Sequence, residues 1–476
     1  MLQVSDREIE SRLRLDNPWW EADGGIEPET HKFPRRAYLA PFVRLVRAAD
    51  VKRAVLLMGP RRVGKTILVY HTIQQLLDKG GVSGRDILYV SLETPIYTGL
   101  SIEDLLKRFR ANFARDPGKT LYVFLDEIQY LHHWEIHLKS LVDTYRDVRF
   151  VATGSAAAAL RTKSAESGAG RFTEFRLPPL TFAEYLRFIG QEDQLIREQG
   201  DEDGPRSYAA LDLGTLNAEF VNYLNYGGFP EAVFSERIQA NPRRYIKSDI
   251  IDKVLLRDLP SLYGISDIQE LNSLFNTLAY NTGRELALED LSKTSHVAKN
   301  TLVRYLEYLE AAFLIRRMRR IDADAKHFQR MTTFKVYLTN PAMRAALFGP
   351  VTETHDAIGQ LAETAVLSQW LHNTAYVDSL HYARWKKGEV DFVSLEPARQ
   401  KPRFAVEVKW SNRVVEDRRG LGALIEFCSR NKLQRRPLVT TVSVSDVRTI
   451  AGVEIEFSPC SLHCYTVAKN TLEGRR

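Results

Sequence analysis

The segment Gly59-Pro60-Arg61-Arg62-Val63-Gly64-Lys65-Thr66 constrains this chain most, because it fits the phosphate-loop pattern G-x-x-x-x-G-K-[ST] at every fixed position. Glycines let the backbone curl so that consecutive N–H groups point at a β-phosphate. In such a loop, Lys65 reaches the β- and γ-phosphate oxygens, and the Thr66 hydroxyl becomes a ligand of the nucleotide's Mg²⁺. The segment therefore predicts that ATP and Mg²⁺ bind through residues 59–66.

The neighbouring sequence supports this interpretation. Residues 54–58 form a continuous apolar run, as expected of a strand buried on both faces. Residues 67–77 then repeat apolar side chains at helical spacing until Gly80-Gly81. Strand, loop and helix in this order are the context that the pattern requires. The alternative, a glycine-rich turn without a ligand, is disfavoured by this context.

A second element of phosphate chemistry follows at residues 121–127, where an apolar strand ends in two carboxylates. Open α/β sheets bind their ligands at the carboxyl ends of the strands. We expect Asp126 to hold Mg²⁺, mostly through water, and Glu127 to polarise the attacking water. A helix N-cap pair is the alternative, which the preceding phosphate loop disfavours. After a further strand, Thr153 or Ser155 would contact the γ-phosphate, with turn chemistry as an equal alternative.

Length and composition indicate an ordinary soluble protein of about three domains. The 476 residues include 66 basic and 60 acidic side chains, and this net charge of +6 is a mild indication of nucleic-acid contact. No apolar run approaches membrane-spanning length, and Met1 is followed by a polar segment rather than a signal peptide. Three cysteines make a disulfide framework unexpected. We expect a cytoplasmic protein without membrane association.

The order of patterns divides the chain into five segments of an α/β protein. They are an N-terminal leader (1–50), a P-loop AAA-type ATPase core (51–176), a helical lid or connector (177–265), a winged helix (266–325) and a last α/β domain (326–476). Strands and helices alternate in the core, which predicts a parallel sheet with helices on both faces. In the leader, Asn17-Pro18-Trp19-Trp20 predicts a clamp of aromatic side chains against the core, rather than an interaction surface.

One arginine near the end of the ATPase core is a candidate for contact with the nucleotide of a neighbouring subunit. Arg171 follows a small, polar stretch and precedes a new strand. An arginine there can act on the γ-phosphate of a neighbouring subunit, which would require a homo-oligomer formed through the ATPase domain. An ordinary surface arginine is the alternative.

The segment 266–325 has the pattern of a winged helix with a basic face. Its second helix would bury Leu302, Tyr305, Leu306 and Leu309. The residues predicted to contact DNA are Lys299, Asn300 and Arg304 on the other helix face, and Arg316, Arg317, Arg319 and Arg320 on a basic wing strand. A winged helix used only for packing is the alternative.

The last domain contains the pattern of a metal-dependent nuclease. Asp391 follows a predicted hairpin turn, and alternation on the next strand places Glu407 and Lys409 on one face. Asp391 and Glu407 on adjacent strands can share a Mg²⁺, while Lys409 would orient or deprotonate the attacking water. Glu363, on a preceding helix, would supply a further carboxylate. An edge strand with alternating charges is the alternative.

The chain resembles a prokaryotic family of AAA-superfamily ATPases related to the archaeal ATPase group. The segments that carry the resemblance are Asn17-Pro18-Trp19-Trp20, Gly59 to Thr66, Asp126-Glu127-Ile128-Gln129, Thr153-Gly154-Ser155, Gly170-Arg171, Tyr226-Gly227-Gly228-Phe229-Pro230-Glu231, Glu389-Val390-Asp391-Phe392 and Glu407-Val408-Lys409. The resemblance implies a P-loop ATPase with a C-terminal domain of unknown function that combines a winged helix and a restriction-endonuclease-like PD-(D/E)xK fold. Val390 departs from the family pattern, which has proline before the aspartate.

Two functions follow as hypotheses. In the first, a Mg²⁺-dependent ATPase controls DNA binding by the winged helix and DNA cleavage at Asp391, Glu407 and Lys409. In the second, the chain is an ATP-dependent switch whose C-terminal domain binds DNA or a partner protein without cutting. Metal-dependent nicking of a plasmid distinguishes the two.

Overall fold

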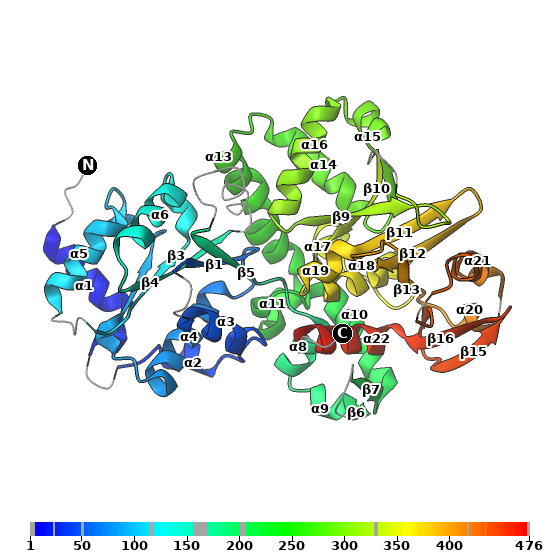
Figure 1. Cartoon of the computed structure of the whole chain (residues 1–476), viewed down its shortest axis with the longest axis horizontal. Helices are drawn as coiled ribbons and strands as arrows, with labels where there is room; N and C mark the ends of the chain where they lie inside the picture. Colours follow the sequence, from blue (N-terminus) through cyan, green and yellow to red (C-terminus); the bar gives the residue numbers. More distant parts are fainter. Residues whose placement is uncertain are drawn as a thin grey trace. The chain divides into compact units, whose positions relative to one another are not determined.

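The structure is a computed structural model that describes residues 5–21, 24–48, 52–113, 118–155, 170–199, 206–327, 332–416, 418–433 and 435–473. The chain forms two compact units, Met1–Leu177 and Pro178–Arg476 (Figure 1). Within the ranges given above, no helix combines the length and the apolar composition needed to cross a membrane.

The first unit is built on a five-stranded parallel sheet. Its strands are β1 (Ala54–Gly59), β2 (Ile87–Ser91), β3 (Leu121–Asp126), β4 (Val148–Ser155) and β5 (Phe172–Arg176), in the order β2-β3-β4-β1-β5. All four strand pairs are parallel. Strands β1 and β3 are buried along their whole length, which explains their uninterrupted apolar sequences. The sheet confirms the predicted P-loop core of an α/β protein.

Helices precede and connect these strands. They are α1 (Asp6–Asp16), α2 (Pro28–Lys32), α3 (Leu39–Arg47), α4 (Lys65–Gly80), α5 (Ile102–Asn112) and α6 (Trp134–Thr144), with 3₁₀ helices at Pro18–Trp20, Gly84–Asp86, Pro95–Tyr97 and Ile128–Tyr130. Helix α4 ends in a left-handed Gly81, as the paired glycines predict.

The N-terminal leader is held against the edge strand β2. The Asn17 side-chain amide donates to the Tyr89 carbonyl (2.9 Å), and its oxygen accepts from the Tyr89 N–H (2.6 Å). The indole N–H groups of Trp19 and Trp20 both donate to the Ile87 carbonyl. These contacts pair backbone groups that an edge strand would otherwise leave open. The predicted clamp against the ATPase core is confirmed.

The second unit contains a nine-stranded mixed sheet. Its strands are β8 (Glu285–Ala287), β9 (Ile315–Ile321), β10 (Thr333–Leu338), β11 (Leu380–Trp385), β12 (Gly388–Leu395), β13 (Pro402–Glu407), β14 (Leu438–Thr441), β15 (Asp446–Ile450) and β16 (Val453–Pro459), in the order β15-β16-β14-β13-β12-β11-β9-β10-β8 (Figure 1). A separate hairpin pairs β6 (Ile196–Gln199) with β7 (Ser207–Ala210).

The second unit also contains helices. They are α8 (Phe182–Phe188), α9 (Glu192–Leu195), α10 (Leu213–Tyr226), α11 (Pro230–Phe234), α12 (Glu236–Ala240), α13 (Leu259–Tyr263), α14 (Ile268–Tyr280), α15 (Leu288–Ser295), α16 (Lys299–Ala311), α17 (Ala342–Phe348), α18 (Ile358–Trp370), α19 (Thr374–Ser379), α20 (Arg413–Glu416), α21 (Gly422–Asn431) and α22 (Cys460–Leu472). Arg243–Asp252 and Val254–Asp258 are π-helical, and Arg418–Leu421 is a 3₁₀ helix.

Two features of this unit differ from the prediction that the chain divides into five separate segments. Strand β9 pairs with β10 on one side and β11 on the other, so the predicted winged helix and the last α/β domain are continuous through one sheet. Helices α8 and α10, predicted in the lid, share a hydrophobic core with α18 and α22 through residues such as Phe182, Phe220, Leu361 and Cys464. The role of residues 177–265 as a lid and the finer domain boundaries stay predictions.

Candidate functional site

The phosphate-loop segment connects β1 to α4, and its backbone adopts turns that depend on glycine. Gly64, directly before α4, has a φ of +90°, and Arg62 has a φ of +64°. A Cβ at Gly59 would lie 2.3 Å from the Leu177 carbonyl oxygen, so this position has no room for a side chain. Left-handed turns of this kind direct successive N–H groups toward a bound anion.

Lys65 and Thr66 begin α4 and lie beside the end of β3. The Lys65 side chain is buried, and its Nζ donates to the carbonyl oxygens of Gly59 (3.2 Å) and Pro60 (3.1 Å). The Thr66 hydroxyl donates to Asp126 Oδ2 at 2.9 Å. Because Mg²⁺ prefers oxygen ligands, the adjacent oxygens of Thr66 and Asp126 fit the predicted metal.

Asp126 is buried and accepts three hydroxyl hydrogen bonds. Besides Thr66, Tyr89 donates to its Oδ2 (3.0 Å) and Thr153 donates to its Oδ1 (2.5 Å). Burial raises the pKa of Asp126, the negative charge of Glu127 adds to the rise, and the hydroxyl groups oppose it. A bound cation would favour the ionised carboxylate. Sequence patterns did not point to Tyr89, whose polar tip within the apolar run of β2 was the available signal.

Glu127 is anchored through both its backbone and its side chain. It has a φ of +56°, and its N–H donates to the Thr153 hydroxyl at 3.0 Å. The Gln129 side-chain amide donates to Glu127 Oε2, while Glu127 Oε1 lies 3.9 Å from Lys65 Nζ. These contacts place the carboxylate beside the lysine of the phosphate loop, where a base that acts on water is needed.

Ser155 lies directly beside the phosphate loop, because the sheet register pairs it with Gly59. Its N–H donates to Gln129 Oε1 at 3.1 Å, but its hydroxyl is buried and has no hydrogen-bond partner among the described residues. An unsatisfied buried hydroxyl costs about 1–3 kcal/mol, and a phosphate oxygen would satisfy it. Since Thr153 is bonded to Asp126, Ser155 is the better candidate for the predicted γ-phosphate contact.

Arg171 lies on the surface at the start of β5. Its guanidinium is 2.5 Å from Asp143 of α6, and both side chains are 44% exposed. Residues 156–169, which include most of the small polar stretch before Arg171, lie outside the described residues. The action of Arg171 on a neighbouring subunit stays a prediction.

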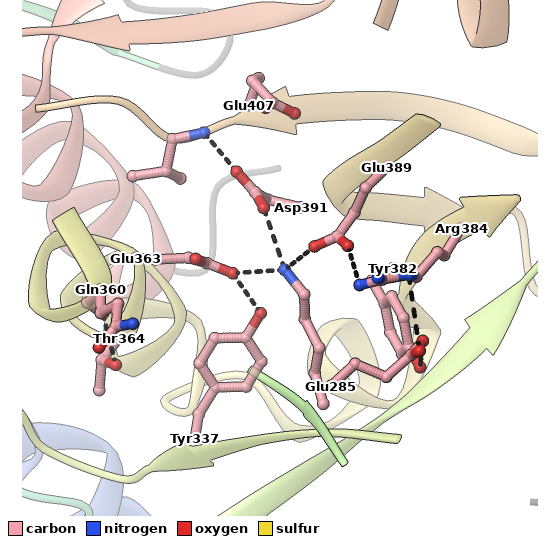
Figure 2. Close-up of polar contacts among 12 residues, drawn as sticks. Glu285, Tyr337, Gln360, Glu363, Thr364, Tyr382, Arg384, Glu389, Asp391 and Glu407 are labelled. Carbon is pink, nitrogen blue, oxygen red and sulfur yellow. Dashed lines mark hydrogen bonds and ion pairs between the residues drawn. The ribbon is translucent and has the colours of Figure 1, made fainter. Parts of the chain in front are cut away.

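A second cluster of charged side chains lies in the C-terminal unit (Figure 2). The carboxylates of Glu363, Glu389 and Asp391 converge on Lys335 Nζ, at 2.9, 2.7 and 3.0 Å. The Lys335 side chain is only 2% exposed, and the three carboxylates satisfy the three donors of its ammonium group. Tyr337 also donates to Glu363 at 2.6 Å. Sequence patterns had indicated Glu363 and Asp391 but not Lys335, the one charged residue of β10.

The same network extends across four strands of the sheet. Arg384 of β11 pairs with Glu389 at 2.5 Å and lies 3.5 Å from Glu285 of β8. Tyr382 donates to Glu285 at 2.6 Å (Figure 2). Charged groups on β8, β10, β11 and β12 are therefore linked, although they come from separate stretches of the chain.

Asp391 and Glu407, the predicted metal ligands, lie on the adjacent strands β12 and β13. Asp391 Oδ2 accepts the N–H of Val408 at 2.9 Å, and Lys409 Nζ donates to Glu407 Oε1 at 2.7 Å. Glu407 Oε2 is buried and lacks a partner in the part of the chain that the structure describes. Both Asp391 oxygens, in contrast, already accept hydrogen bonds, from Lys335 and from the Val408 N–H, and a divalent cation shared by Asp391 and Glu407 stays a prediction.

Burial and charge perturb the carboxylates of this cluster. Burial, with the charge of Asp391, raises the pKa of Glu407 to about 8 and the pKa of Glu363 to about 7. Burial acts on Asp391 too, but the charges of Lys335 and Lys409 outweigh it and hold the pKa of Asp391 below its usual value. Across the described residues, no three Asp, Glu, His or Cys side chains are arranged to hold a metal ion. The role of Glu363 as a ligand stays a prediction.

Helices α15 and α16 follow one another with residues 296–298 between them, and the winged helix predicted for residues 266–325 stays a prediction. Leu302, Tyr305, Leu306 and Leu309 of α16 are buried, as their spacing predicted. Lys299, Asn300 and Arg304 are exposed on the other face, and Lys299 pairs with Glu289 of α15 at 2.7 Å. This face is accessible for contact with a partner.

The four arginines of β9 are less accessible than the sequence suggested, because β9 is an interior strand rather than a free wing. Arg317 pairs with Glu310 at 2.5 Å, Arg316 pairs with Asp378 at 2.6 Å, and Arg320 donates to the Arg384 carbonyl at 3.0 Å. Arg319 is exposed. Contacts of these side chains with DNA stay predictions.

The parallel sheet, the phosphate loop after β1 and the acidic pair after β3 define the first unit as a P-loop NTPase fold. Comparison with known families narrows this class. Residues 51–186 match the model of a family described as an AAA domain. Residues 217–354 match a domain of unknown function (DUF8612), a range that begins within α10 and ends after α17.

Proteins of archaea and bacteria are similar to most of this chain. An uncharacterized protein of Methanocaldococcus jannaschii is 26% identical over 369 residues, or 74% of this chain and 75% of its own length. An uncharacterized protein of Haemophilus influenzae is 24% identical over 311 residues, which are 64% of this chain and 72% of that protein. Among solved structures, the Aeropyrum pernix ORC1 protein in complex with DNA is 15% identical and has a TM-score of 0.32. The match covers 65% of this chain and 91% of the ORC1 chain. The Aeropyrum pernix ORC2 protein is 14% identical and has a TM-score of 0.39, and the match covers 68% of this chain and 93% of the ORC2 chain.

Proposed function

We propose that this chain is a Mg²⁺-dependent ATPase whose nucleotide state controls DNA binding by the second unit. The observation that carries the ATPase part is the 2.9 Å contact between Thr66 and Asp126, next to the buried Lys65. It joins the end of the phosphate loop to the acidic end of β3, the two elements that P-loop enzymes use to hold the metal.

Each side chain of this site has a defined part in the proposed hydrolysis. Lys65 would exchange its two carbonyl partners for phosphate oxygens. Thr66 and Asp126 would hold the Mg²⁺ ion, which neutralises negative charge on the phosphates when bound. Glu127 would orient the attacking water and accept its proton, and the Ser155 hydroxyl would donate to the γ-phosphate.

Steady-state ATP hydrolysis by the purified chain tests the ATPase part. We expect Lys65→Ala to weaken ATP binding, and Glu127→Gln to bind ATP but turn over about 10²–10⁴-fold more slowly, the usual contribution of a general base. Lys79→Ala is the matched control, since Lys79 is an exposed lysine in the last turn of the same helix. Equal turnover by wild type and Glu127→Gln would remove Glu127 from its role.

The DNA-binding part is supported by the exposed Lys299, Asn300 and Arg304 on the helix that follows the turn. Fluorescence anisotropy with a labelled duplex, with and without a non-hydrolysable ATP analogue, measures binding and its dependence on nucleotide. Arg304→Ala should weaken binding, whereas Lys293→Ala on α15, exposed and ion-paired, serves as the control. Affinity that is indifferent to the ATP analogue would contradict control by nucleotide state.

DNA cleavage is a second candidate activity, and the orphaned Glu407 Oε2 favours it. Asp391 and Glu407 would hold a divalent cation, which supplies Lewis acidity when bound. Lys409 would position the attacking water and offset charge on the reacting phosphate.

Incubation with plasmid and Mg²⁺ or Mn²⁺, with and without ATP, tests this activity. Nicking that Asp391→Ala and Lys409→Ala abolish would support cleavage. Retardation of DNA without nicking in either metal would contradict cleavage. The remaining hypothesis would then be the ATP-dependent switch, which binds DNA or a partner protein without cutting.

A further inference from the structure

A cavity of about 680 Å³ opens in the second unit, away from the carboxylate cluster. It is lined by Ser394 of β12 and Phe404 of β13, which are register partners in the sheet. Asp391 and Glu407 lie three residues further along these strands, or roughly 10 Å at 3.3 Å per residue. The volume is within the range of pockets that hold small molecules.

The walls of the cavity include aromatic rings suited to a planar ligand. The ring centroids of Trp370 and Tyr376 lie 5.8 Å apart, and Phe404 of β13 also lines the cavity. Trp370 is buried, whereas Tyr376 and Phe404 are half-buried. Aromatic side chains of this kind stack against nucleobases and tolerate any base, since every base has a π-face.

Two arginines of the lining have no acidic partner among the residues that the structure describes. The Arg435 N–H donates to the Arg403 carbonyl at 3.2 Å, so the two residues are neighbours. Within the described ranges, neither guanidinium forms an ion pair or a hydrogen bond, whereas Arg206 and Arg436 are each paired with a glutamate. Of the described residues that line the cavity, Glu456 alone is acidic. The uncompensated pair is suited to a phosphate, which guanidinium groups bind in a bidentate manner.

Both arginines also lie near one of the aromatic walls. Burial raises the pKa of Tyr376, and the positive charges of Arg435 and Arg403 oppose that rise. The cavity therefore combines its positive charge with its stacking surface.

A buried histidine adds a polar group without a partner. His463 of α22 is 7% exposed, and its ring centroid lies 6.4 Å from that of Trp370. Its Nε2 has no hydrogen-bond partner among the residues described. Burial lowers the pKa of His463 to about 4, so that the ring is neutral and offers one donor and one acceptor. The edge of a nucleobase would satisfy this nitrogen.

We propose that this cavity is a nucleotide-binding site, separate from the phosphate loop, that takes a nucleobase against Tyr376 and Phe404 and a phosphate at Arg403 and Arg435. Two sources share this chemistry: a free nucleotide, and the terminal or unstacked nucleotide of a DNA strand. The site goes beyond the proposed ATPase function and does not depend on it.

Isothermal titration of the full-length chain tests the proposal in a Lys65→Ala background, which weakens nucleotide binding at the phosphate loop. The probes are AMP and a 5′-phosphorylated single-stranded tetranucleotide. We expect at least one probe to bind, and the double substitution Arg403→Gln/Arg435→Gln to raise its dissociation constant at least about tenfold, or 1.4 kcal/mol. Arg430→Gln is the matched control, because Arg430 is an exposed arginine of α21 that does not line the cavity.

The outcomes distinguish a free nucleotide from a DNA strand as the ligand, and they show whether the proposed site is wrong. Binding of AMP assigns a free nucleotide, and binding of the tetranucleotide alone assigns a DNA strand. No binding of either probe at 1 mM, or equal binding by the double variant with an unchanged melting temperature, would overturn the site. ATP hydrolysis by the wild-type chain is measured separately, so that failure of one proposal leaves the other standing.

Discussion

Replacing Lys335 with methionine removes the ammonium group that holds the C-terminal carboxylates together. Lys335 Nζ lies within 3.0 Å of three carboxylates, and its side chain is 2% exposed. Methionine retains much of the side-chain volume but supplies neither charge nor donors. Removing one partner of a buried ion pair destabilises a protein by about 3–5 kcal/mol. Since three carboxylates lose their partner here, we expect the upper end of that range at pH 8.

The loss should depend on pH. The pKa of Glu363 is raised to about 7 and that of Glu407 to about 8, so the folded protein binds these protons more tightly than the unfolded chain. Their contribution to stability is complete below the unfolded pKa of about 4.3 and is lost as pH rises through these folded values. Without the ammonium of Lys335, the carboxylates take up protons still more readily. The penalty of Lys335→Met should therefore be smaller at pH 5.5 than at pH 8.

Urea denaturation at both pH values, followed by circular dichroism, measures this effect as a change in the free energy of unfolding. Lys299→Met is the control, because it removes an exposed lysine from a surface ion pair and should leave the midpoint unchanged. An unchanged midpoint for Lys335→Met at pH 8, or a larger loss at pH 5.5 than at pH 8, would refute the reasoning.

Three further substitutions test other parts of the structure. Asn17→Ala leaves the backbone of Tyr89 without its partner, so the first unit should lose about 1–3 kcal/mol of stability on urea denaturation, and an unshifted midpoint would contradict this. Thr153→Val removes a hydrogen bond to Asp126, so kcat for ATP hydrolysis should fall about tenfold; a raised KM with normal kcat would show the wrong assignment. Arg304→Ala should reduce the slope of log affinity for DNA against log salt by about 0.9, the value for one phosphate contact, and an unchanged slope would exclude that contact.

The first site could be predicted closely because its chemistry is encoded in short, contiguous segments. Residues 59–66 specify a turn whose geometry depends on glycine at Gly59 and Gly64, and both positions have the predicted constraint. The uninterrupted apolar runs of β1 and β3 indicated buried parallel strands, which place Asp126 beside the phosphate loop. Such features are local, so their consequence follows from spacing alone.

The second unit shows what spacing cannot provide. Glu363 and Asp391 were identifiable from the sequence, but Lys335, 28 residues before Glu363 and 56 before Asp391, joins them only through strand pairing and helix packing. The placement of β9 between β10 and β11, which engages most of its arginines inside the unit, likewise depends on the register of distant strands.

The sequence by itself thus determined the phosphate-binding turn, the acidic pair after β3 and the buried face of α16, because each depends on neighbouring residues. Only the tertiary structure decided which charges meet around Lys335, and that Tyr89 and Thr153 hold Asp126. Strand order and register set these contacts, and they are fixed by burial across the whole sheet rather than by the pattern of any one strand.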